Sequence, residues 1–422
     1  MCRGRRWRCE TRSRLDRVVR VLVVTQYYRP EIGAPPNRLG SFVDGLVAAG
    51  HDVEVVCEQP NHPAGVFFPG FGGRPLFTEH EQGATIRRLW VATSRRKTTA
   101  RRLAFYATFA AGAGIAALIV RRPHVVFVSS PPLPGALMVA AAARARRIPY
   151  VLDVRDLWPA AAEALGEISN PSTIRALERA ERWIYRNAAR VTTTTAPFCS
   201  HVNSLAGSGK AAHLPNGAMD ELLDVPVVGR AAVQPVTIGY AGNFGIAQGL
   251  SVVLDAAEEL ADVPVRFVMI GEGPLKEQFL ADRDRRDLNG LVKVRPEQPQ
   301  SNIAPVLAQC DALLVPLRDS PVLRDFIPSK LYDAMALGRP AIVAAAGEPH
   351  RLVEQTGCGL AIPPENGRAL AAAIRRIIDD PAAAAEMGRA GREAAQNLVR
   401  SRQIQRLESI LTEVAGGRQC AA

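Results

Sequence analysis

The segment 325–340, DFIPSKLYDAMALGRP, combines a lysine with the signals that begin a helix. Ser329 is a good candidate for the N-cap, because its side chain could accept a hydrogen bond from the first turn. The amides that follow, from Lys330 and Leu331 onward, would then be free at the helix N-terminus, where the helix dipole attracts anions. The Lys330 ammonium adds a full positive charge there. The segment therefore predicts a binding site for an anion such as a phosphate group.

Two aspartates flank this predicted anion site. Asp333 lies about one turn inside the expected helix, where its carboxylate could bind vicinal hydroxyls such as those of ribose. Asp325 precedes the helix and could reach a hydroxyl of a sugar. The alternative is a capped surface helix with ordinary acidic residues, and the segment alone leaves both possibilities open.

Three more turns follow expected strands in the same half of the chain: GYAGNFGIAQGL, IGEGP and the Arg295-Pro296 turn. Glycines in the first two would let a ligand approach the backbone closely. The first turn does not have the spacing of a dinucleotide-binding fingerprint or of a P-loop. Each signal is weak singly, but their order within one domain favours a common ligand site.

The elements that must position these residues are short apolar runs alternating with segments of helix length. Such alternation predicts an α/β fold with parallel sheets covered by helices on both faces. The expected strands lie at 18–24, 52–57, 85–91, 124–130, 150–154 and 190–195, and then at 236–242, 265–271, 291–294, 311–317, 340–345 and 359–362. We predict two doubly wound, Rossmann-like domains facing a cleft, with ligands beyond the carboxyl ends of the strands.

The expected domain boundaries follow the breaks in this alternation, and 422 residues are too many for one ordinary core. The predicted parts are a disordered basic tail (1–17), an N-terminal domain (18–215), a linker rich in Pro, Gly and polar residues (216–235), a C-terminal domain (236–400) and a helix returning to the N-terminal domain (401–422).

The net charge of +11 comes from two short segments. Residues 1–20 carry +6 and residues 95–122 carry +7, so the remainder carries −2. The sequence has no aromatic-interleaved basic patch and no nucleic-acid motif, so we expect no nucleic-acid partner. Its seven cysteines are dispersed, odd in number and without a C-x-x-C pair, which fits a reducing cytoplasm. No metal-ligand cluster is visible, and we expect no metal.

The segment 103–120, LAFYATFAAGAGIAALIV, is uncharged and lies between pairs of arginines. It could be a buried or half-buried helix of the domain. It could also be an interfacial helix on the cytoplasmic leaflet, with its arginines on anionic headgroups. A membrane span is the third possibility, although its many Ala and Gly residues drive insertion weakly.

The C-terminal half resembles the donor domain of retaining glycosyltransferases of family 4, which have the two-domain GT-B fold. IGEGP, the strand from Asp311 to Pro316 and PSKLYDAMALGRPAIVA match the order and spacing of that family. The family usually has two glutamates where this chain has Asp325 and Asp333.

One loop departs from the family pattern: Asn243 and Gln248 replace its usual arginine and lysine. The pattern GN-x-G-x-A-QGL at this place resembles the subgroup related to fucosamine transferases of O-antigen assembly. The N-terminal half agrees, because segment 27–71 resembles the first strand, loop and helix of that subgroup. RDLWPAAAEALG likewise resembles its RDLWPE loop. The resemblance extends from about residue 18 to 415.

The resemblance implies roles for individual residues. Lys330, with the amides of Ser329 and Leu331, would hold the diphosphate, and Asp333 would bind the ribose. The other donor-site candidates are Gly33 near the phosphates, Gly242, Asn243 and Gln248 in the first donor-domain loop, and Gly271, Gly273, Arg295 and Pro296 around the nucleobase. The acceptor-side candidates are His62, Arg155 and Trp158, and the catalytic candidates are Asp156, Glu163 and Asp325.

Some of these candidates have ordinary structural alternatives. His62 could be a loop histidine, Trp158 could serve packing, and Asp156 could form a structural salt bridge with Arg155.

The resemblance implies an enzyme that moves a sugar, with retention of configuration, from a nucleotide sugar to a glycan or polyprenyl-linked acceptor in cell-surface polysaccharide synthesis. UDP is preferred over GDP as the carrier. We expect a cytoplasmic protein, peripheral on the inner face of the cell membrane through 95–122. The alternatives are a catalytically silent GT-B partner subunit, which Asn243 and Gln248 favour, and a nucleotide-sugar epimerase, which PSKLYDAMALG disfavours.

Overall fold

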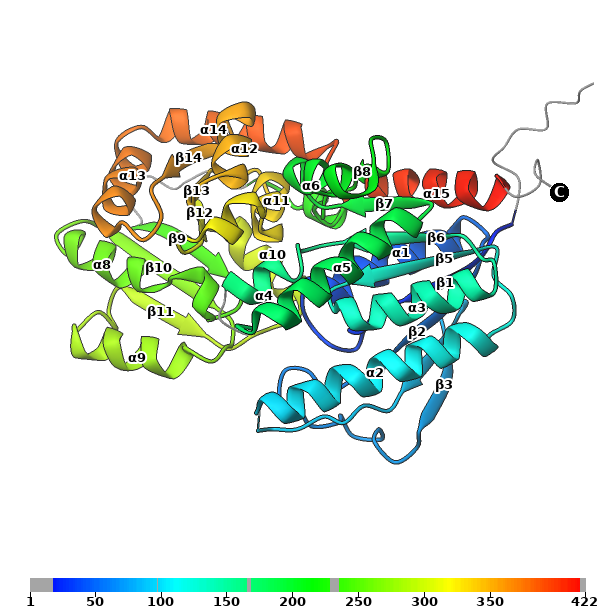
Figure 1. The fold of residues 1–422 in the computed structure, drawn as a ribbon. Coiled ribbons are helices and arrows are strands. Elements are labelled where there is room, and N and C mark those ends of the chain that lie inside the picture. Colours follow the sequence, from blue (N-terminus) through cyan, green and yellow to red (C-terminus); the bar gives the residue numbers. More distant parts are fainter. Residues whose placement is uncertain (1–17, 97, 165–167, 228–234, 418–422) are drawn as a thin grey trace, which may run out of the picture.

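The computed structural model describes residues 18–96, 98–164, 168–227 and 235–417. They form two α/β domains, each built on one sheet (Figure 1). The predicted tail at 1–17, residues 228–234 of the predicted linker and residues 418–422 lie outside the described residues.

The N-terminal sheet has eight strands in the order β3-β4-β2-β1-β5-β6-β7-β8. Neighbouring strands are parallel except at one edge, where β3 runs antiparallel to β4. The prediction of two α/β domains is confirmed, but this sheet is mixed rather than wholly parallel. Its strands are β1 (Arg20–Val24), β2 (Asp52–Glu58), β3 (Leu76–Glu81), β4 (Ala84–Leu89), β5 (Val125–Ser130), β6 (Tyr150–Val154), β7 (Arg190–Thr193) and β8 (Ala211–His213).

Helices cover both faces of this sheet, because successive strand residues point to opposite sides. Leu22 and Val24 of β1 pack in the cluster that α2, α3 and α5 complete. Val21 and Val23 pack in the opposite cluster, with α1 and α15. The helices are α1 (Ala34–Ala48), α2 (Thr99–Ile119), α3 (Leu133–Ala145), α4 (Ala160–Ala164), α5 (Pro171–Asn187), α6 (Ala196–Ala206) and α15 (Arg400–Gly416).

Helix α2 contains the apolar segment 103–120. One of its faces, which includes Phe109 and Ala113, is buried, and α2 packs along α3. The other face exposes Leu103 (65%), Ile115 (58%) and Ile119 (75%). By length and composition α2 is apolar enough to cross a membrane, yet a third of its most apolar window is buried inside the fold. In this structure α2 is therefore a half-buried helix of the N-terminal domain.

The C-terminal sheet is wholly parallel, with the order β11-β10-β9-β12-β13-β14. Its strands are β9 (Val236–Ala241), β10 (Val265–Ile270), β11 (Val292–Arg295), β12 (Ala312–Pro316), β13 (Ala341–Ala344) and β14 (Gly359–Ile362). The helical elements are α7 (Glu221–Asp224), η1 (Ile246–Gln248), α8 (Ser251–Glu259), α9 (Lys276–Arg285), α10 (Gln300–Ala308), η2 (Pro321–Asp325), α11 (Ser329–Ala336), α12 (Glu348–Thr356), α13 (Gly367–Asp379) and α14 (Pro381–Ala395).

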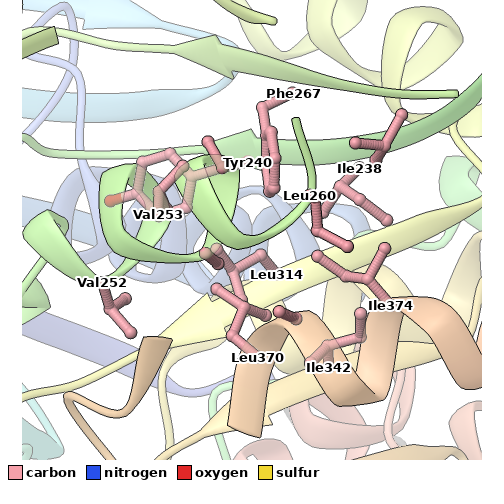
Figure 2. Close-up of a cluster of buried hydrophobic side chains, with 14 of the residues drawn as sticks. Ile238, Tyr240, Val252, Val253, Leu260, Phe267, Leu314, Ile342, Leu370 and Ile374 are labelled. Carbon is pink, nitrogen blue, oxygen red and sulfur yellow. The ribbon is translucent and has the colours of Figure 1, made fainter. Parts of the chain in front are cut away.

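The core of this domain lies on both faces of the sheet. Figure 2 shows one face, where Phe267 and Leu314 of the strands belong to the same buried cluster as Leu370 of α13. The other face packs against α10, α11, α12 and α14. Strands buried on both sides explain the continuous apolar runs of the sequence.

The chain passes between the domains twice, and the two crossings are neighbours. Ala218 N–H donates to Leu398 O at 2.9 Å, and Arg400 N–H donates to Ala218 O at 2.7 Å. After the second crossing, α15 packs against α1, β5 and β6 of the N-terminal domain (Figure 1). The contact with α1 is close, because a Cβ on Gly45 would lie 2.5 Å from Ile404 Cγ2.

Candidate active site

Helix α11 begins at Ser329, and Pro328 occupies the cap position with an extended ψ of 136°. The prediction that Ser329 caps this helix is therefore wrong: Ser329 is its first helical residue, and no side chain caps it. The amide of Leu331 is not free either, because it donates to Pro328 O at 3.0 Å. The amides of Ser329 and Lys330 remain without a carbonyl partner inside the helix.

The Lys330 side chain connects α11 to the loop after β9. Its Nζ donates to Tyr240 Oη at 3.1 Å and lies 4.2 Å from the centre of the Tyr240 ring. Tyr240 Oη in turn donates to Asn243 O at 2.7 Å. Burial lowers the pKa of Lys330 to about 7, and the Asp333 carboxylate opposes that shift. Lys330 is therefore half charged near neutral pH and poised to take up a proton beside an anion.

Glycines let the loops after β9 and β10 touch. Gly242 (φ 151°) faces Lys330, since a Cβ there would lie 2.7 Å from Lys330 Nζ. A Cβ on Gly271 (φ 153°) would lie 1.9 Å from Gly242 O, and one on Gly273 would lie 2.3 Å from Asn243 Oδ1. Gly271 N–H donates to Arg295 O at 3.2 Å, which brings the β11 loop with Arg295 and Pro296 alongside. The turns singled out in the sequence thus adjoin.

The two amide side chains that replace the expected cations meet around Gly245. A Cβ on Gly245 would lie 2.8 Å from both Asn243 Nδ2 and Gln248 Oε1. Gln248 Oε1 is buried and has no hydrogen-bond partner among the described residues. It therefore needs a donor that a ligand or water supplies.

The two aspartates of the opening segment have different surroundings. Burial raises the pKa of Asp333 to about 6, and the Arg400 and Lys330 charges oppose this. Asp325 is the last residue of η2, which lies next to α4 of the N-terminal domain. Glu163 is exposed on α4, so Asp325 and Glu163 come from elements that meet between the domains.

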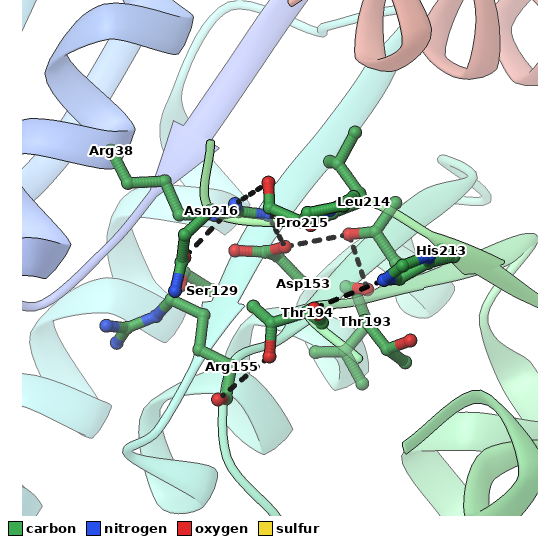
Figure 3. A network of polar contacts seen from close by, with 12 residues as sticks. Arg38, Ser129, Asp153, Arg155, Thr193, Thr194, His213, Leu214, Pro215 and Asn216 are labelled. Atoms are coloured by element: carbon green, nitrogen blue, oxygen red, sulfur yellow. Dashed lines mark hydrogen bonds and ion pairs between the residues drawn. The ribbon is translucent and has the colours of Figure 1, made fainter. Parts of the chain in front are cut away.

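Arg155 follows β6 and is held by the carboxyl end of β5 and the residue after it (Figure 3). Its Nε donates to Ser129 Oγ at 2.8 Å and its Nη2 to Pro131 O at 2.9 Å. Burial lowers the pKa of Arg155 and raises that of the neighbouring Asp156. Arg155 is thus fixed to main chain and hydroxyl oxygens at the carboxyl end of the sheet.

Beside it, Arg38 of α1 joins the sheet to the first domain crossing (Figure 3). Arg38 is 1% exposed. It donates to Leu214 O at 2.9 Å, to Pro215 O at 2.8 Å and to Asp153 Oδ1 at 3.1 Å.

The remaining predicted residues of the N-terminal domain do not form one cluster. His62 is exposed, with its ring 5.1 Å from that of Tyr27. Trp158 packs against the hydrophobic core that α2, α3 and α5 cover, which is the packing role considered as its structural alternative. Gly33 (φ 147°) precedes α1, and its carbonyl accepts from Asn37 N–H at 3.1 Å.

Sequence reasoning missed Tyr240, Glu31 and Glu58. Tyr240 reads as an ordinary apolar strand residue. Glu31 and Glu58 are 3% and 1% exposed and lie after β1 and at the end of β2. The available signal was an acid at the carboxyl end of a parallel strand, which is where ligands bind in such sheets. Within the described ranges, no group of three or more His, Cys, Asp or Glu side chains could hold a metal ion.

Comparison with known proteins agrees with this arrangement. Residues 33–217 match the family model "Glycosyl transferase 4-like domain", and residues 228–394 match "Glycosyl transferases group 1". A relative is the putative colanic acid biosynthesis glycosyl transferase WcaI of Escherichia coli. It is 25% identical over 387 residues, which cover 85% of this chain and 92% of WcaI.

Two solved structures show the same fold over nearly the whole chain. Sucrose-phosphate synthase from Thermosynechococcus elongatus has a TM-score of 0.70 at 17% identity and covers 94% of this chain and 100% of that chain. Anabaena HepE in complex with UDP-glucose has a TM-score of 0.67 at 16% identity, with the same coverage. The architecture is therefore GT-B. The two family matches show a glycosyl transferase 4-like domain followed by a glycosyl transferases group 1 domain, and the chain is a glycosyltransferase.

Proposed function

We propose that this glycosyltransferase uses a nucleotide sugar, with a UDP-sugar as the first candidate, and that its diphosphate binds at the N-terminus of α11. The contact of Lys330 with Tyr240 and Gly242 carries this proposal. It places a titratable cation, two helix amides and a glycine loop around one point, and these groups together bind phosphates. The solved HepE complex contains UDP-glucose, which supports the same choice of donor.

The proposed transfer proceeds with retention of configuration and without a dedicated carboxylate nucleophile. Asp333 binds the ribose hydroxyls and Asp325 the donor sugar. The protein contributes positioning, together with stabilisation of the departing diphosphate by Lys330 and the helix amides. This stabilisation needs no metal ion. Gln248 Oε1, buried without a partner among the described residues, accepts a hydrogen bond from the donor.

The proposed acceptor is a glycan or polyprenyl-linked glycan in cell-surface polysaccharide synthesis. The similarity to WcaI, named for colanic acid biosynthesis, supports this assignment. His62, Arg155 and Asp156, which lie at or near the carboxyl ends of the N-terminal strands, contact the acceptor in this proposal.

Calorimetric titration with UDP and GDP tests the donor site. UDP should bind the wild type, and Lys330→Ala and Asp333→Ala should each weaken binding at least tenfold. Lys293→Ala is the matched control, because Lys293 is another lysine of the same domain, and its Nζ donates to Asn289 O rather than to the proposed site. If neither nucleotide binds the wild type, or if Lys330→Ala binds UDP as well as Lys293→Ala does, the proposed donor site is refuted.

We further propose that the enzyme works on the cytoplasmic face of the membrane, with α2 as its contact. The exposed apolar face of α2 lies beside the arginines of segment 95–122, a combination that suits anionic headgroups. The quadruple change of Arg95, Arg96, Arg101 and Arg102 to Gln should weaken co-sedimentation with anionic liposomes.

The control for this experiment removes four exposed charges from the C-terminal domain, by changing Arg285, Arg351, Arg368 and Arg389 to Gln. Equal loss of liposome binding in both proteins would attribute it to net charge alone. Unchanged binding after the first change would refute the membrane contact.

A further inference from the structure

Two buried carboxyl groups lie beneath the loop that carries His62. Glu31 Oε1 accepts from the backbone N–H groups of Asn61 and His62, both at 2.8 Å. Glu58 Oε1 accepts from Asn61 Nδ2 at 2.7 Å, and Glu58 Oε2 accepts from Gln26 Nε2 at 2.8 Å. The two glutamates therefore hold Asn61 from both its backbone and its side chain.

The loop 61–65 depends on these contacts for its shape. Gly65 N–H donates to Asn61 O at 2.8 Å, which closes the turn. Thr93 Oγ1 donates to Asn61 Oδ1 at 2.8 Å, so Asn61 also ties the loop to the segment that leads into α2. His62, next to this anchor, lies with its ring 5.1 Å from Tyr27. Moving Asn61 would move His62 with it.

Glu31 and Glu58 are both buried and both bind Asn61, and the charge of Glu31 acts on Glu58, so the two carboxylates cannot both carry a charge at low cost. The groups that Glu31 accepts from are backbone amides, which stabilise an ionised carboxylate. Glu58 accepts from the side-chain amides of Gln26 and Asn61, which also lower its pKa but are outweighed by other effects. Burial, and then the Glu31 charge, raise the pKa of Glu58 well above its ordinary value. Burial also raises the pKa of Glu31, but the amides of Asn61 and His62 oppose this. Glu31 therefore loses its proton before Glu58, and Glu58 keeps its proton to higher pH.

The surrounding groups do not supply a positive charge that could take the place of the proton on Glu58. Arg88, the cation that acts on Glu31, already binds Glu79 and donates to Arg29 O at 2.8 Å. Burial raises the pKa of Cys57 to about 12 and raises those of Tyr27 and Tyr28, so these groups stay neutral. The titratable or charged groups that act on the pair are Tyr27, Cys57 and Arg88, and those that act on these neighbours or on Tyr28 are Tyr28, Arg29, Asp44, Glu79, Glu81, Tyr106 and Arg155.

We propose that Glu31 and Glu58 are positioning residues that fix the loop 61–65, and with it His62, and that this requires a proton on Glu58. The role of His62 toward an acceptor rests on the proposed function, whereas the proton-dependent anchor does not. Since the pKa of Glu58 is raised in the folded state, the anchor is intact at low pH and is lost as the pH rises through that pKa. Deprotonation would place a second buried charge beside Glu31.

Hydrogen exchange of the full-length protein tests the anchor, because the Asn61 and His62 amides are the groups that Glu31 holds. Exchange of peptides covering 59–66 would be followed from about pH 6 to about pH 9 and corrected for the intrinsic pH dependence. In the wild type, protection should fall at alkaline pH. In Glu58→Gln, which is neutral throughout, protection should persist. Glu31→Ala should exchange at least about tenfold faster at all pH values.

Matched variants keep the test decisive. Glu31→Gln retains the accepting oxygen and should restore most of the protection that Glu31→Ala loses, and it replaces Glu31→Ala if that protein fails to fold. Asp52 lies on β2, the strand that also carries Glu58, but pairs at the surface with Arg20. Asp52→Asn should therefore behave as the wild type. An alkaline loss unchanged in Glu58→Gln, or unchanged exchange in both Glu31 variants, would overturn the proposal.

UDP titration of the same proteins separates this inference from the proposed function. All the variants should bind UDP as the wild type does, because the donor site lies in the other domain. If the wild type binds no UDP while the exchange results hold, the donor proposal fails and the anchor stands.

Discussion

Affinity for UDP should decline steeply as the pH rises above neutrality, because Lys330 must gain a proton to hold the diphosphate. Lys330 is half-buried against Tyr240, and its removal from water lowers its pKa to about 7. Diphosphate binding favours the ammonium form, since opposite charges within a few Å raise the pKa of a lysine. Binding and protonation are therefore linked.

The magnitude follows from the pKa. At about pH 8 only about a tenth of the free protein carries the Lys330 proton, and each pH unit above the pKa costs about 1.4 kcal/mol of binding free energy. UDP should bind about tenfold more weakly at about pH 8 than at its optimum, and about a hundredfold more weakly at about pH 9. Binding at about pH 8 should take up about 0.9 proton per UDP.

Calorimetry over this pH range, repeated in buffers of different ionisation enthalpy, measures both quantities. Lys330→Arg is the decisive variant, because a guanidinium stays protonated throughout and should flatten the alkaline decline. Lys293→Arg is its control. The decline in affinity at acid pH has two sources, since both Asp333 and the terminal phosphate of UDP titrate near pH 6. An alkaline decline that is absent in the wild type, or that persists in Lys330→Arg, would refute the assignment of this proton to Lys330.

Three further changes test the framework around the site. Gly271→Ala should lower both the melting temperature and the affinity for UDP, because the new Cβ would clash with Gly242 O. Differential scanning fluorimetry and the UDP titration measure the two effects. A variant unchanged in both would contradict the contact between the loops. Leu370→Ala, at a fully buried position, should lower the free energy of unfolding of the C-terminal domain by about 2 to 5 kcal/mol in urea titrations. Arg38→Ala should lower the free energy of unfolding of the N-terminal domain by about 3 to 5 kcal/mol, because it leaves the buried Asp153 carboxylate without this cation. A loss below about 1 kcal/mol would show that other groups compensate the Asp153 charge.

The sheets could be predicted from the sequence because their strands are buried on both faces. β12 (Ala312–Pro316) lies within the predicted strand 311–317, because a short unbroken apolar run is typical of a strand buried on both faces. β3 was not predicted, because it is not buried on both faces. Its sequence LFTEHE is polar and partly exposed at the sheet edge, so only its pairing with β4 makes it a strand.

The site could be predicted only where one segment carries the whole signal. The start of α11 was placed within one residue from Pro-Ser-Lys, although Pro328 and not Ser329 occupies the cap. The partner of Lys330 could not be found in this way, because Tyr240 lies ninety positions earlier in the chain and only the fold brings the two side chains together. Glu31 and Glu58 were missed likewise, since their role depends on amides of a distant loop.

The pairing of the two domain crossings makes the C-terminal domain an insertion, in the topological sense, into the N-terminal one. Both the first described strand and the last helix belong to the N-terminal domain, and α15 supplies Leu407 and Leu411 to its core. A fragment that ends at the first crossing would therefore expose that core. Excising the inserted part instead, and joining Gly217 to Arg400 through a short flexible linker, keeps every layer of the sheet covered. Arg400 Nη2 already donates to Gly217 O at 3.1 Å, so the two ends that must be joined are neighbours.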